Sequence, residues 1–232
     1  MQNIFITGGT GYIGSRLIKA LERDGNFCIQ ALVRQSSASK LPQGCEVVIG
    51  DALDAATYKH GIKKSSTFIH LVGVAHPSPA KKEEFKKIDL VSIHEAVNAA
   101  VEKEISHFIY LSVSMYPANI MKAYQEVRAE GEAILTASGL ATSFIRPWYV
   151  LGPGHWWPVF LKPFYWIAKM IPSKREAATE LDTVTIKQMI RTLVYAVKNQ
   201  PAENAVYGVQ KIRSFNQQNI YYDKHRTCSI SI

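Results

Sequence analysis

TGGTGYIG, residues 7–14, separates a short apolar run at residues 3–6 from a segment with helical periodicity that begins at Ser15. Glycine has no side chain, so it lets a backbone turn tightly and approach a ligand closely. The N–H groups at the amino terminus of a helix attract anions. In the order strand, turn and helix, Gly8 makes the tight turn, Gly11 the close approach, and Gly14 the contact between helix and strand. The stretch therefore predicts a site for the pyrophosphate of a dinucleotide, the alternative being a turn with a structural role alone.

Strand-like and helix-like segments alternate along the first two thirds of the chain. Six apolar runs have the length and β-branched content of buried strands, at residues 3–6, 27–33, 46–49, 67–72, 107–111 and 142–145. Four stretches have the apolar spacing of helices, at residues 13–23, 54–60, 84–103 and 119–138. This alternation predicts an α/β protein with a doubly wound parallel sheet, the Rossmann architecture, in which ligands bind at the carboxyl ends of the strands.

The sequence changes character after Arg146-Pro147. Residues 148–172 contain the four tryptophans of the chain and few polar groups. Thr185-Ile186-Lys187-Gln188 is typical of a capping box that opens a helix, and residues 205–212 have the pattern of a last strand. We therefore expect residues 1–147 to form a dinucleotide-binding domain. Residues 148–232 are expected to complete the sheet and to cover the substrate cleft as a small lid.

The composition indicates a globular protein with a basic surface. Hydrophobic residues make up 47% of the chain, charged residues 20%, and the net charge is +8. The cations are spread along the sequence without a nucleic-acid-binding motif, so they indicate a solvated surface, or attraction to a phosphate-bearing cofactor or an anionic membrane.

Cys28, Cys45 and Cys228 lack metal-ligand spacing and predict a reducing compartment and no metal site. Without a signal peptide or transmembrane run, the sequence predicts a cytoplasmic protein.

Side chains that follow the second, third and fourth predicted strands bear on the dinucleotide. Arg34 stands where NAD-binding sheets usually carry an acidic residue, about twenty residues after the last glycine. A guanidinium accommodates a 2′-phosphate, so Arg34 favours NADP(H) over NAD(H), unless it is an ordinary exposed arginine. Asp51 either accepts from the adenine amino group, with Leu53 against the ring, or caps the turn before the next helix. Gly73 leaves room for the dinucleotide to cross the sheet.

The motifs of the chain resemble those of the short-chain dehydrogenase/reductase superfamily, in its atypical and extended branches. The resemblance covers residues 1–154 and is to NmrA-like and isomerase-like NAD(P)-binding proteins and the nucleotide-binding accessory subunit of respiratory complex I. It rests on TGGTGYIG, Gly50-Asp51, Leu71-Val72-Gly73 and Phe144-Ile145-Arg146-Pro147. The resemblance and the strand-end positions together assign the cofactor, NADP or else NAD, to Gly8, Thr10, Gly11, Tyr12, Ile13, Gly14, Arg34, Asp51, Ala52, Leu53, Leu71, Val72, Gly73, Arg128, Pro147 and Val150.

The resemblance also implies a catalytic set of serine, tyrosine and lysine. In the family the tyrosine moves a proton as hydride moves to or from nicotinamide, and the lysine binds the ribose. Tyr124 matches the tyrosine of the YxxxK motif, but Arg128 stands where that motif has lysine. The serine that orients the substrate carbonyl is Ser112 or Ser114, and the sequence does not choose between them.

Tyr124 and Arg128 are four residues apart on a predicted helix and so share one of its faces. A cation beside a phenol favours the phenolate, which is the form that a general base needs. Three roles stay open for this pair: catalysis, contact of Arg128 with the cofactor, and a surface pair without chemistry. Glu130 and Glu132 follow closely and are candidate partners of Arg128.

The loop after the sixth predicted strand, Pro147-Trp148-Tyr149-Val150, runs beside the nicotinamide in the family, which the resemblance carries over to Pro147 and Val150. The aromatic residues beyond it form either a substrate lid or a small core. As a lid they favour an apolar or aromatic, quinone-like substrate. His155 is expected to pack or hydrogen-bond in this loop rather than to act as an acid.

The leading hypothesis is an NADP(H)-dependent oxidoreductase that transfers hydride to or from a small carbonyl or quinone-like substrate. The alternative is a non-catalytic NADP(H)-binding sensor or assembly subunit, which the missing lysine favours. A third hypothesis is contact with a membrane surface through residues 156–175, which combine Trp, Phe, Tyr and Lys. The oligomeric state stays open, although the family often pairs through the helices that flank the tyrosine, which implies a homodimer.

Overall fold

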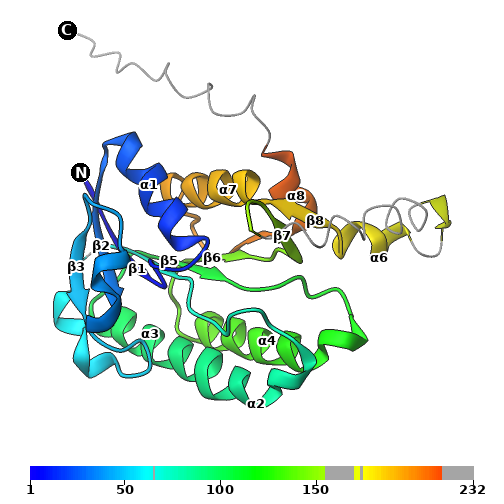
Figure 1. Cartoon of the computed structure of the whole chain (residues 1–232), viewed down its shortest axis with the longest axis horizontal. Helices are drawn as coiled ribbons and strands as arrows, with labels where there is room; N and C mark the ends of the chain where they lie inside the picture. Colours follow the sequence, from blue (N-terminus) through cyan, green and yellow to red (C-terminus); the bar gives the residue numbers. More distant parts are fainter. Residues whose placement is uncertain (65, 155–169, 173–174, 216–232) are drawn as a thin grey trace, which may run out of the picture.

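A parallel β-sheet runs through the centre of the computed structural model, which describes residues 1–64, 66–154, 170–172 and 175–215 (Figure 1). Within these residues the sheet has the strand order β3-β2-β1-β4-β5-β6-β9, and every neighbouring pair is parallel. Its strands are β1 (Gln2–Thr7), β2 (Phe27–Val33), β3 (Glu46–Ile49), β4 (Thr67–His70), β5 (His107–Leu111), β6 (Thr142–Ile145) and β9 (Ala205–Tyr207). The predicted α/β class with a doubly wound parallel sheet is confirmed.

Helices cover both faces of this sheet (Figure 1). On one face lie α1 (Gly14–Asp24), α7 (Ile186–Lys198) and α8 (Val209–Ser214), and on the other lie α3 (Val91–Glu102) and α4 (Lys122–Ala137). Successive side chains of a strand point to opposite faces. Accordingly Ile4 and Ile6 belong to the core under α1 and α7, whereas Phe5, between them, belongs to the core under α3.

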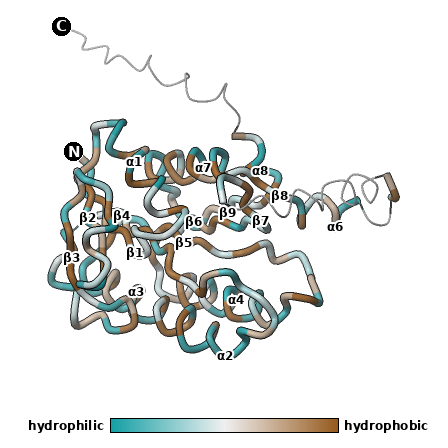
Figure 2. The backbone as a smooth tube through the Cα atoms, in the orientation of Figure 1, coloured by the Kyte–Doolittle hydropathy of each residue, from teal (hydrophilic) through white to brown (hydrophobic). Residues whose placement is uncertain are grey.

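Hydropathy follows the same layering (Figure 2). The strands in the middle of the molecule are largely hydrophobic, whereas the short α2 (Lys82–Glu84) at the outer edge is hydrophilic. Strands that are buried on both faces need apolar residues at successive positions, which is why they read as continuous apolar runs in the sequence.

The carboxy-terminal part supplies strand β9 and helices α7 and α8 to this architecture. β9 pairs with β6 at the edge of the sheet, and β7 (Tyr149–Leu151) pairs with β8 (Thr183–Thr185) in a separate two-stranded ladder. The predicted capping box at the start of α7 is confirmed, because the Thr185 side chain accepts from the Gln188 N–H and the Gln188 side chain accepts from the Thr185 N–H. The short α6 (Arg175–Glu180) precedes β8.

The segment predicted as a helix at residues 54–60 is instead two 3₁₀ turns, Ala55–Thr57 and Lys59–Gly61. The Asp54 carboxylate accepts from the backbone N–H of Ala56 at 3.0 Å. A side-chain acceptor of this kind offers the backbone a local alternative to a longer helix, and seven residues are few for a stable one.

Two predicted strands were too long. The strand predicted at residues 67–72 ends at His70, because His70 pairs with Thr7 and the glycine-rich turn begins after Thr7. The strand predicted at residues 205–212 ends at Tyr207, after which α8 begins.

The long helix predicted at residues 84–103 has an interruption. It consists of α2, the π-helical turn Phe85–Leu90, and α3. A π-helical turn places an extra residue in the helix, and such turns are frequent at functional sites. This one carries the carboxylate of Asp89, which is 1% exposed, into the interior.

Several predictions concern residues outside those described. They are the histidine at position 155, the aromatic residues 156–169, Cys228, and the tail after residue 215. Among the described residues, no helix has both the length and the apolar character that crossing a bilayer requires.

Two buried histidines make stability depend on pH. Burial lowers the pKa of His107 to about 4, and burial with the nearby Arg128 charge lowers that of His70 to about 3. A histidine whose pKa is lower in the folded state stabilises fully above its unfolded pKa of about 6.5, and this contribution is lost as the pH falls.

We expect His107→Gln to flatten the acid loss of stability. As the pH falls from 6.5 to 5, the loss of free energy of unfolding caused by each buried histidine should steepen toward about 1.4 kcal/mol per pH unit. Urea unfolding of the wild type at stepped pH should therefore show a steeper loss than the variant does. His60→Gln, at an exposed position, is the control and should keep the wild-type slope. Equal slopes for wild type and His107→Gln would contradict the assignment.

Candidate active site

The glycine-rich turn joins β1 to α1 with little free space. Gly8 has a φ of 77°, and its carbonyl oxygen accepts from the Gly11 N–H at 3.0 Å. A Cβ atom on Gly14 would lie 2.2 Å from that oxygen, and one on Gly8 would lie 2.9 Å from the carbonyl carbon of Leu71. The sequence can therefore form this turn only with glycine at both positions, and α1 begins directly against it.

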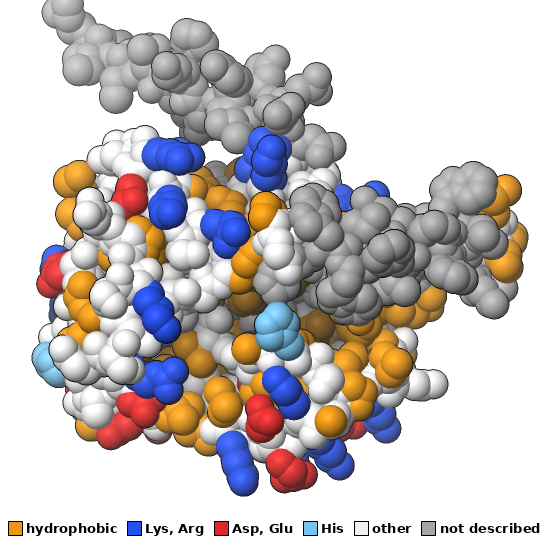
Figure 3. Space-filling model, in the orientation of Figure 1, with side chains coloured by type: hydrophobic (Ala, Val, Ile, Leu, Met, Phe, Trp, Pro, Cys, Tyr) orange, Lys and Arg blue, Asp and Glu red, His pale blue; other side chains and the backbone are white. Residues whose placement is uncertain are grey.

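A cleft of about 540 Å³ opens between this turn, the carboxyl ends of β4 and β5, and the start of α4. In Figure 3 apolar side chains gather in a hollow between the layer of α1 and α7 and the layer of α4. We call it the central cleft. Its lining is largely apolar, with a few polar groups, and consists of Gly8, Gly11, Tyr12, Ile13, Gly14, Leu71, Gly73, Val74, Ala75, His76, Pro77, Leu111, Ser112, Val113, Met121, Tyr124, Arg128, Pro147, Trp148, Tyr149 and Val150.

The central cleft brings together most of the site residues predicted from the sequence. The predicted residues that do not line it are Thr10, Arg34, Asp51, Ala52, Leu53, Val72 and Ser114. Arg34 is exposed, immediately before the 3₁₀ turn Gln35–Lys40. Asp51 accepts from the Leu53 N–H at 3.0 Å, so its carboxylate caps a turn, as one of the two readings expected. Contact of these residues with an adenosine stays a prediction.

The two candidate serines have different surroundings. Ser112 lines the central cleft, and its buried Oγ has no hydrogen-bond partner within the described part of the chain. Ser114 lies behind it, where its Oγ accepts weakly from the Tyr116 N–H at 3.4 Å. Gln125 of α4 donates to the carbonyls of Ser114 and Tyr116 at 2.6 and 2.7 Å, which holds this loop against the helix.

Tyr124 and Arg128 share a face of α4, as predicted, but the arginine points inward. Its side chain is 4% exposed, and its guanidinium carbon lies 5.2 Å from the centroid of the Tyr124 ring. The cation thus lies over the ring, where the quadrupole of the ring attracts it. Tyr124 itself is half-buried and lies at 5.0 Å from the ring of Phe85.

The partner of Arg128 is Asp89, and the expected pairing with Glu130 or Glu132 is wrong. Nη2 of Arg128 lies 2.6 Å from Oδ1 of Asp89, whose side chain is fully buried. Glu132 instead forms an ion pair with Arg146, with Nε of Arg146 donating at 2.9 Å. Glu132 lies about one helical turn along α4 from Arg128, and the cation that it meets there is Arg146, which follows β6.

Electrostatics keep this arginine charged. Burial alone would lower the pKa of Arg128, but the negative potential of Tyr124, Tyr110 and Asp89 outweighs burial and raises it. Burial raises the pKa of the Asp89 carboxyl, which the guanidinium and the Val74 N–H offset in part. Removing one partner of such a buried pair leaves an uncompensated charge, which typically costs about 3–5 kcal/mol.

A chain of buried polar groups continues from Asp89 to the glycine-rich turn. Ser92 donates to the Asp89 carbonyl at 3.1 Å and lies 3.3 Å from Nε2 of His70, while Nδ1 of His70 lies 2.9 Å from the Thr7 hydroxyl. Since the Ser92 proton goes to the carbonyl, Nε2–H of His70 donates to Ser92 and Nδ1 accepts from Thr7. A neutral imidazole satisfies both contacts.

The residues present fit a dinucleotide. Gly11 is exposed and has no side chain, so a ligand can approach its backbone closely. The N–H groups at the start of the helix that follows attract anions. Ser112 lines the cleft, and its buried Oγ, which has no hydrogen-bond partner among the described residues, still needs one. No cluster of three His, Cys, Asp or Glu residues that could hold a metal ion is found in residues 1–64, 66–154, 170–172 and 175–215.

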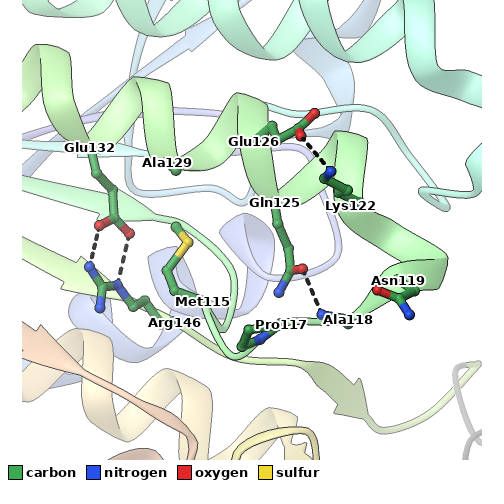
Figure 4. Close-up of a pocket in the computed structure, with 10 residues that line it drawn as sticks. All are labelled: Met115, Pro117, Ala118, Asn119, Lys122, Gln125, Glu126, Ala129, Glu132 and Arg146. Carbon is green, nitrogen blue, oxygen red and sulfur yellow. Dashed lines mark hydrogen bonds and ion pairs between the residues drawn. The ribbon is translucent and has the colours of Figure 1, made fainter.

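A second hollow, of about 520 Å³, lies beside α4 (Figure 4). Gln125 and Glu132 point into it from the helix, and Arg146 reaches it from the end of β6. Its own polar groups pair with one another, since Gln125 accepts from the Ala118 N–H at 3.1 Å and Glu132 binds Arg146. None of its lining residues lines the central cleft.

Asp89 is the residue of the site that sequence reasoning missed. The available signal was a carboxylate inside an apolar helical run, Ile88-Asp89-Leu90-Val91. A charge on the buried side of a helix needs a partner, and Arg128 was the cation without a convincing one. Residues 74–77 also line the cleft, but the sequence did not predict this. They reach the cleft through the path of the loop after β4, which no sequence pattern indicates.

Comparisons with known proteins agree with the fold and with the predicted dinucleotide-binding family. A family model for NAD(P)H-binding proteins matches residues 8–153. UDP-glucose 4-epimerase of Vibrio cholerae is 22% identical over 90% of this chain and 70% of the epimerase. The 4-hydroxy-2-methyl-3-oxo-4-farnesyl-3,4-dihydroquinoline-1-oxide ketoreductase of Stigmatella aurantiaca is 23% identical over 64% of this chain, which spans 50% of its length. The structure of MoeE5 in complex with UDP-glucose and NAD is similar with a TM-score of 0.67, at 19% identity, over 91% of this chain and 80% of that one. At this identity the similarity shows the fold.

Proposed function

The chain belongs to the NAD(P)H-binding family, with the fold of short-chain dehydrogenases and epimerases, and on this premise we propose that it is an NAD(P)H-dependent oxidoreductase. The observation that carries the proposal is the convergence of the glycine-rich turn, Ser112 and Tyr124 on one cleft. A reduced nicotinamide supplies hydride, and a reductase needs a proton donor and a hydrogen-bond donor beside the substrate carbonyl.

Each of these tasks has a residue in the central cleft. Tyr124 holds a phenolic proton at the cleft surface and donates it to the substrate oxygen in the reducing direction. Ser112, with an Oγ that lacks a partner among the described residues, donates a hydrogen bond to the same oxygen. The backbone of Gly11 and the start of α1 bind the pyrophosphate, and Pro147 and Val150 form the wall beside the nicotinamide.

The substrate is proposed to be a small apolar or aromatic ketone or quinone. Val74, Met121 and Trp148 give the cleft an apolar wall, which excludes water and favours such a ligand. The Stigmatella relative is a ketoreductase of a quinoline, in keeping with this class. Sugar nucleotides such as UDP-glucose, which is present in the MoeE5 structure, are the competing class of substrate. A substrate of that class requires many polar partners in the protein. The part of the chain beyond β6 is proposed to cover the substrate, since Tyr149 already lines the cleft.

A second candidate function is a dinucleotide-binding module without catalysis. The observation that favours it is the buried position of Arg128, which pairs with Asp89 instead of facing the cleft as an exposed cation. Such a module would bind the cofactor and turn over no carbonyl or quinone substrate. The two functions differ in whether Tyr124 matters for turnover.

Tyr124→Phe should lower the rate of carbonyl or quinone reduction by about 100-fold or more, because the phenolic proton is lost and the ring is kept. Cofactor affinity, measured by calorimetry, should stay within about threefold of the wild type. Tyr116→Phe is the matched control, since this tyrosine does not line the cleft, and should keep the wild-type rate. Undiminished turnover by Tyr124→Phe would contradict the catalytic role, and no turnover by the wild type over a broad panel would favour the module.

Preference for NADPH over NADH is proposed to depend on Arg34. Calorimetric titration of the ligand-free protein should show tighter binding of NADPH, and Arg34→Ala should weaken it about tenfold while leaving NADH unchanged. Lys40→Ala, at the other end of the same 3₁₀ turn, is the charge control. Equal loss for both cofactors, or tighter NADH binding by the wild type, would overturn this role of Arg34.

A further inference from the structure

Gly73 stands against the guanidinium of Arg128. A Cβ atom at position 73 would lie 2.1 Å from Nη2 of Arg128 and 3.0 Å from Oδ1 of Asp89. Gly73 is not among the glycines with positive φ, so its backbone is one that alanine also adopts. What excludes a side chain here is therefore the guanidinium and not the conformation of the loop.

The guanidinium has little freedom to move aside. Nη1 donates to the Leu111 carbonyl at 2.9 Å, and Nη2 lies 2.6 Å from Asp89 and 3.5 Å from the Val72 carbonyl. These contacts tie the ends of β4 and β5 to the π-helical turn. The planar fork of arginine makes all of them at once, whereas the ammonium of a lysine acts as a single point charge.

Asp89 extends these contacts to the wall of the cleft. Its Oδ2 accepts from the Val74 N–H at 2.9 Å, and Val74 lines the central cleft next to Gly73. The same carboxylate holds the guanidinium of Arg128, which lies against the ring of Tyr124. One buried carboxylate thus connects the loop after β4 with the helix that carries the proposed proton donor.

Resting on the proposed function, we infer that Gly73, Asp89 and Arg128 form one positioning unit that holds Tyr124 in the cleft, and that Arg128 does not bind the sugar of the cofactor. Nearly all of the Arg128 side chain is enclosed, and four of its contacts are to the protein. An arginine that reached for ribose hydroxyls would have to leave Asp89 as an unpaired buried charge, which is unfavourable. At the lysine position of the YxxxK motif, this chain thus has an arginine that belongs to an internal support.

The first test is a double-mutant cycle on the protein without cofactor, with thermal unfolding as the readout. Gly73→Ala should lower the melting temperature by roughly 5 °C or more, because the added methyl group displaces a tethered guanidinium. In an Arg128→Lys background the same change should cost less than half of that shift, since the planar group is gone. Equal shifts in both backgrounds would overturn the unit.

Gly208→Ala is the matched control for this cycle. Gly208 has a φ of −73° and a ψ of 176°, and a Cβ atom there would meet nothing closer than 3.8 Å. Because Gly208 is the N-cap of α8, where alanine is less favourable than glycine, Gly208→Ala should lower the melting temperature by a smaller amount than Gly73→Ala, and by the same amount in both backgrounds. A shift at Gly208 as large as that at Gly73 would show a general effect of replacing glycine in a loop, and would also overturn the inference.

The second test separates positioning from cofactor binding. Arg128→Lys and Asp89→Asn should each lower kcat about tenfold and keep the calorimetric Kd for NADPH within about threefold. A change of the Kd by more than tenfold with kcat retained would identify Arg128 as a cofactor ligand and overturn the inference. If the wild type bound no dinucleotide, the proposed function would fail. The double-mutant cycle at Gly73 would still test whether Gly73, Asp89 and Arg128 form one unit, because thermal unfolding needs no ligand.

Discussion

Contact between Gly14 and the carbonyl oxygen of Gly8 is the constraint on which the site depends. The Cβ position of Gly14 lies 2.2 Å from that oxygen, so α1 can begin directly against the turn only with glycine there. α1 packs on α7, and β1 lies between β2 and β4, so this turn is fixed by both layers around it. The start of α1 thereby faces the ends of β4 and β5, where the polar groups of the cleft are.

The opposite side of the cleft is held by a buried charge pair rather than by close packing of backbone. Asp89 and Arg128 come from the π-helical turn and from α4, and they meet above the ends of β4 and β5. Ser92 and His70 connect the backbone carbonyl of Asp89 to Thr7, the residue before the glycines. Buried polar groups therefore extend from the residue that pairs with Arg128 to the glycine-rich turn on the other side of the cleft.

Much of the fold could be predicted because local patterns determine it. The strands at residues 27–33, 46–49, 107–111 and 142–145 were placed to the residue, since buried parallel strands are short continuous apolar runs. The capping box at Thr185 was equally local. The partner of Arg128 could not be predicted, because the π-helical turn that carries Asp89 inward leaves no periodic signal. Gly73 was expected to make room for the dinucleotide, whereas the atom that crowds it is Nη2 of Arg128.

Amide hydrogen exchange with and without NADPH tests the central claim, that one cleft between the glycine-rich turn and Tyr124 binds the dinucleotide. The account predicts slower exchange on NADPH addition in residues 8–14, 34–36, 71–75, 112–113 and 148–150, with the other strand residues of the sheet unchanged. This measurement needs neither a substrate nor a variant. Slower exchange confined to the residues around the second hollow beside α4, or no change at saturating NADPH and NADH, would contradict the account.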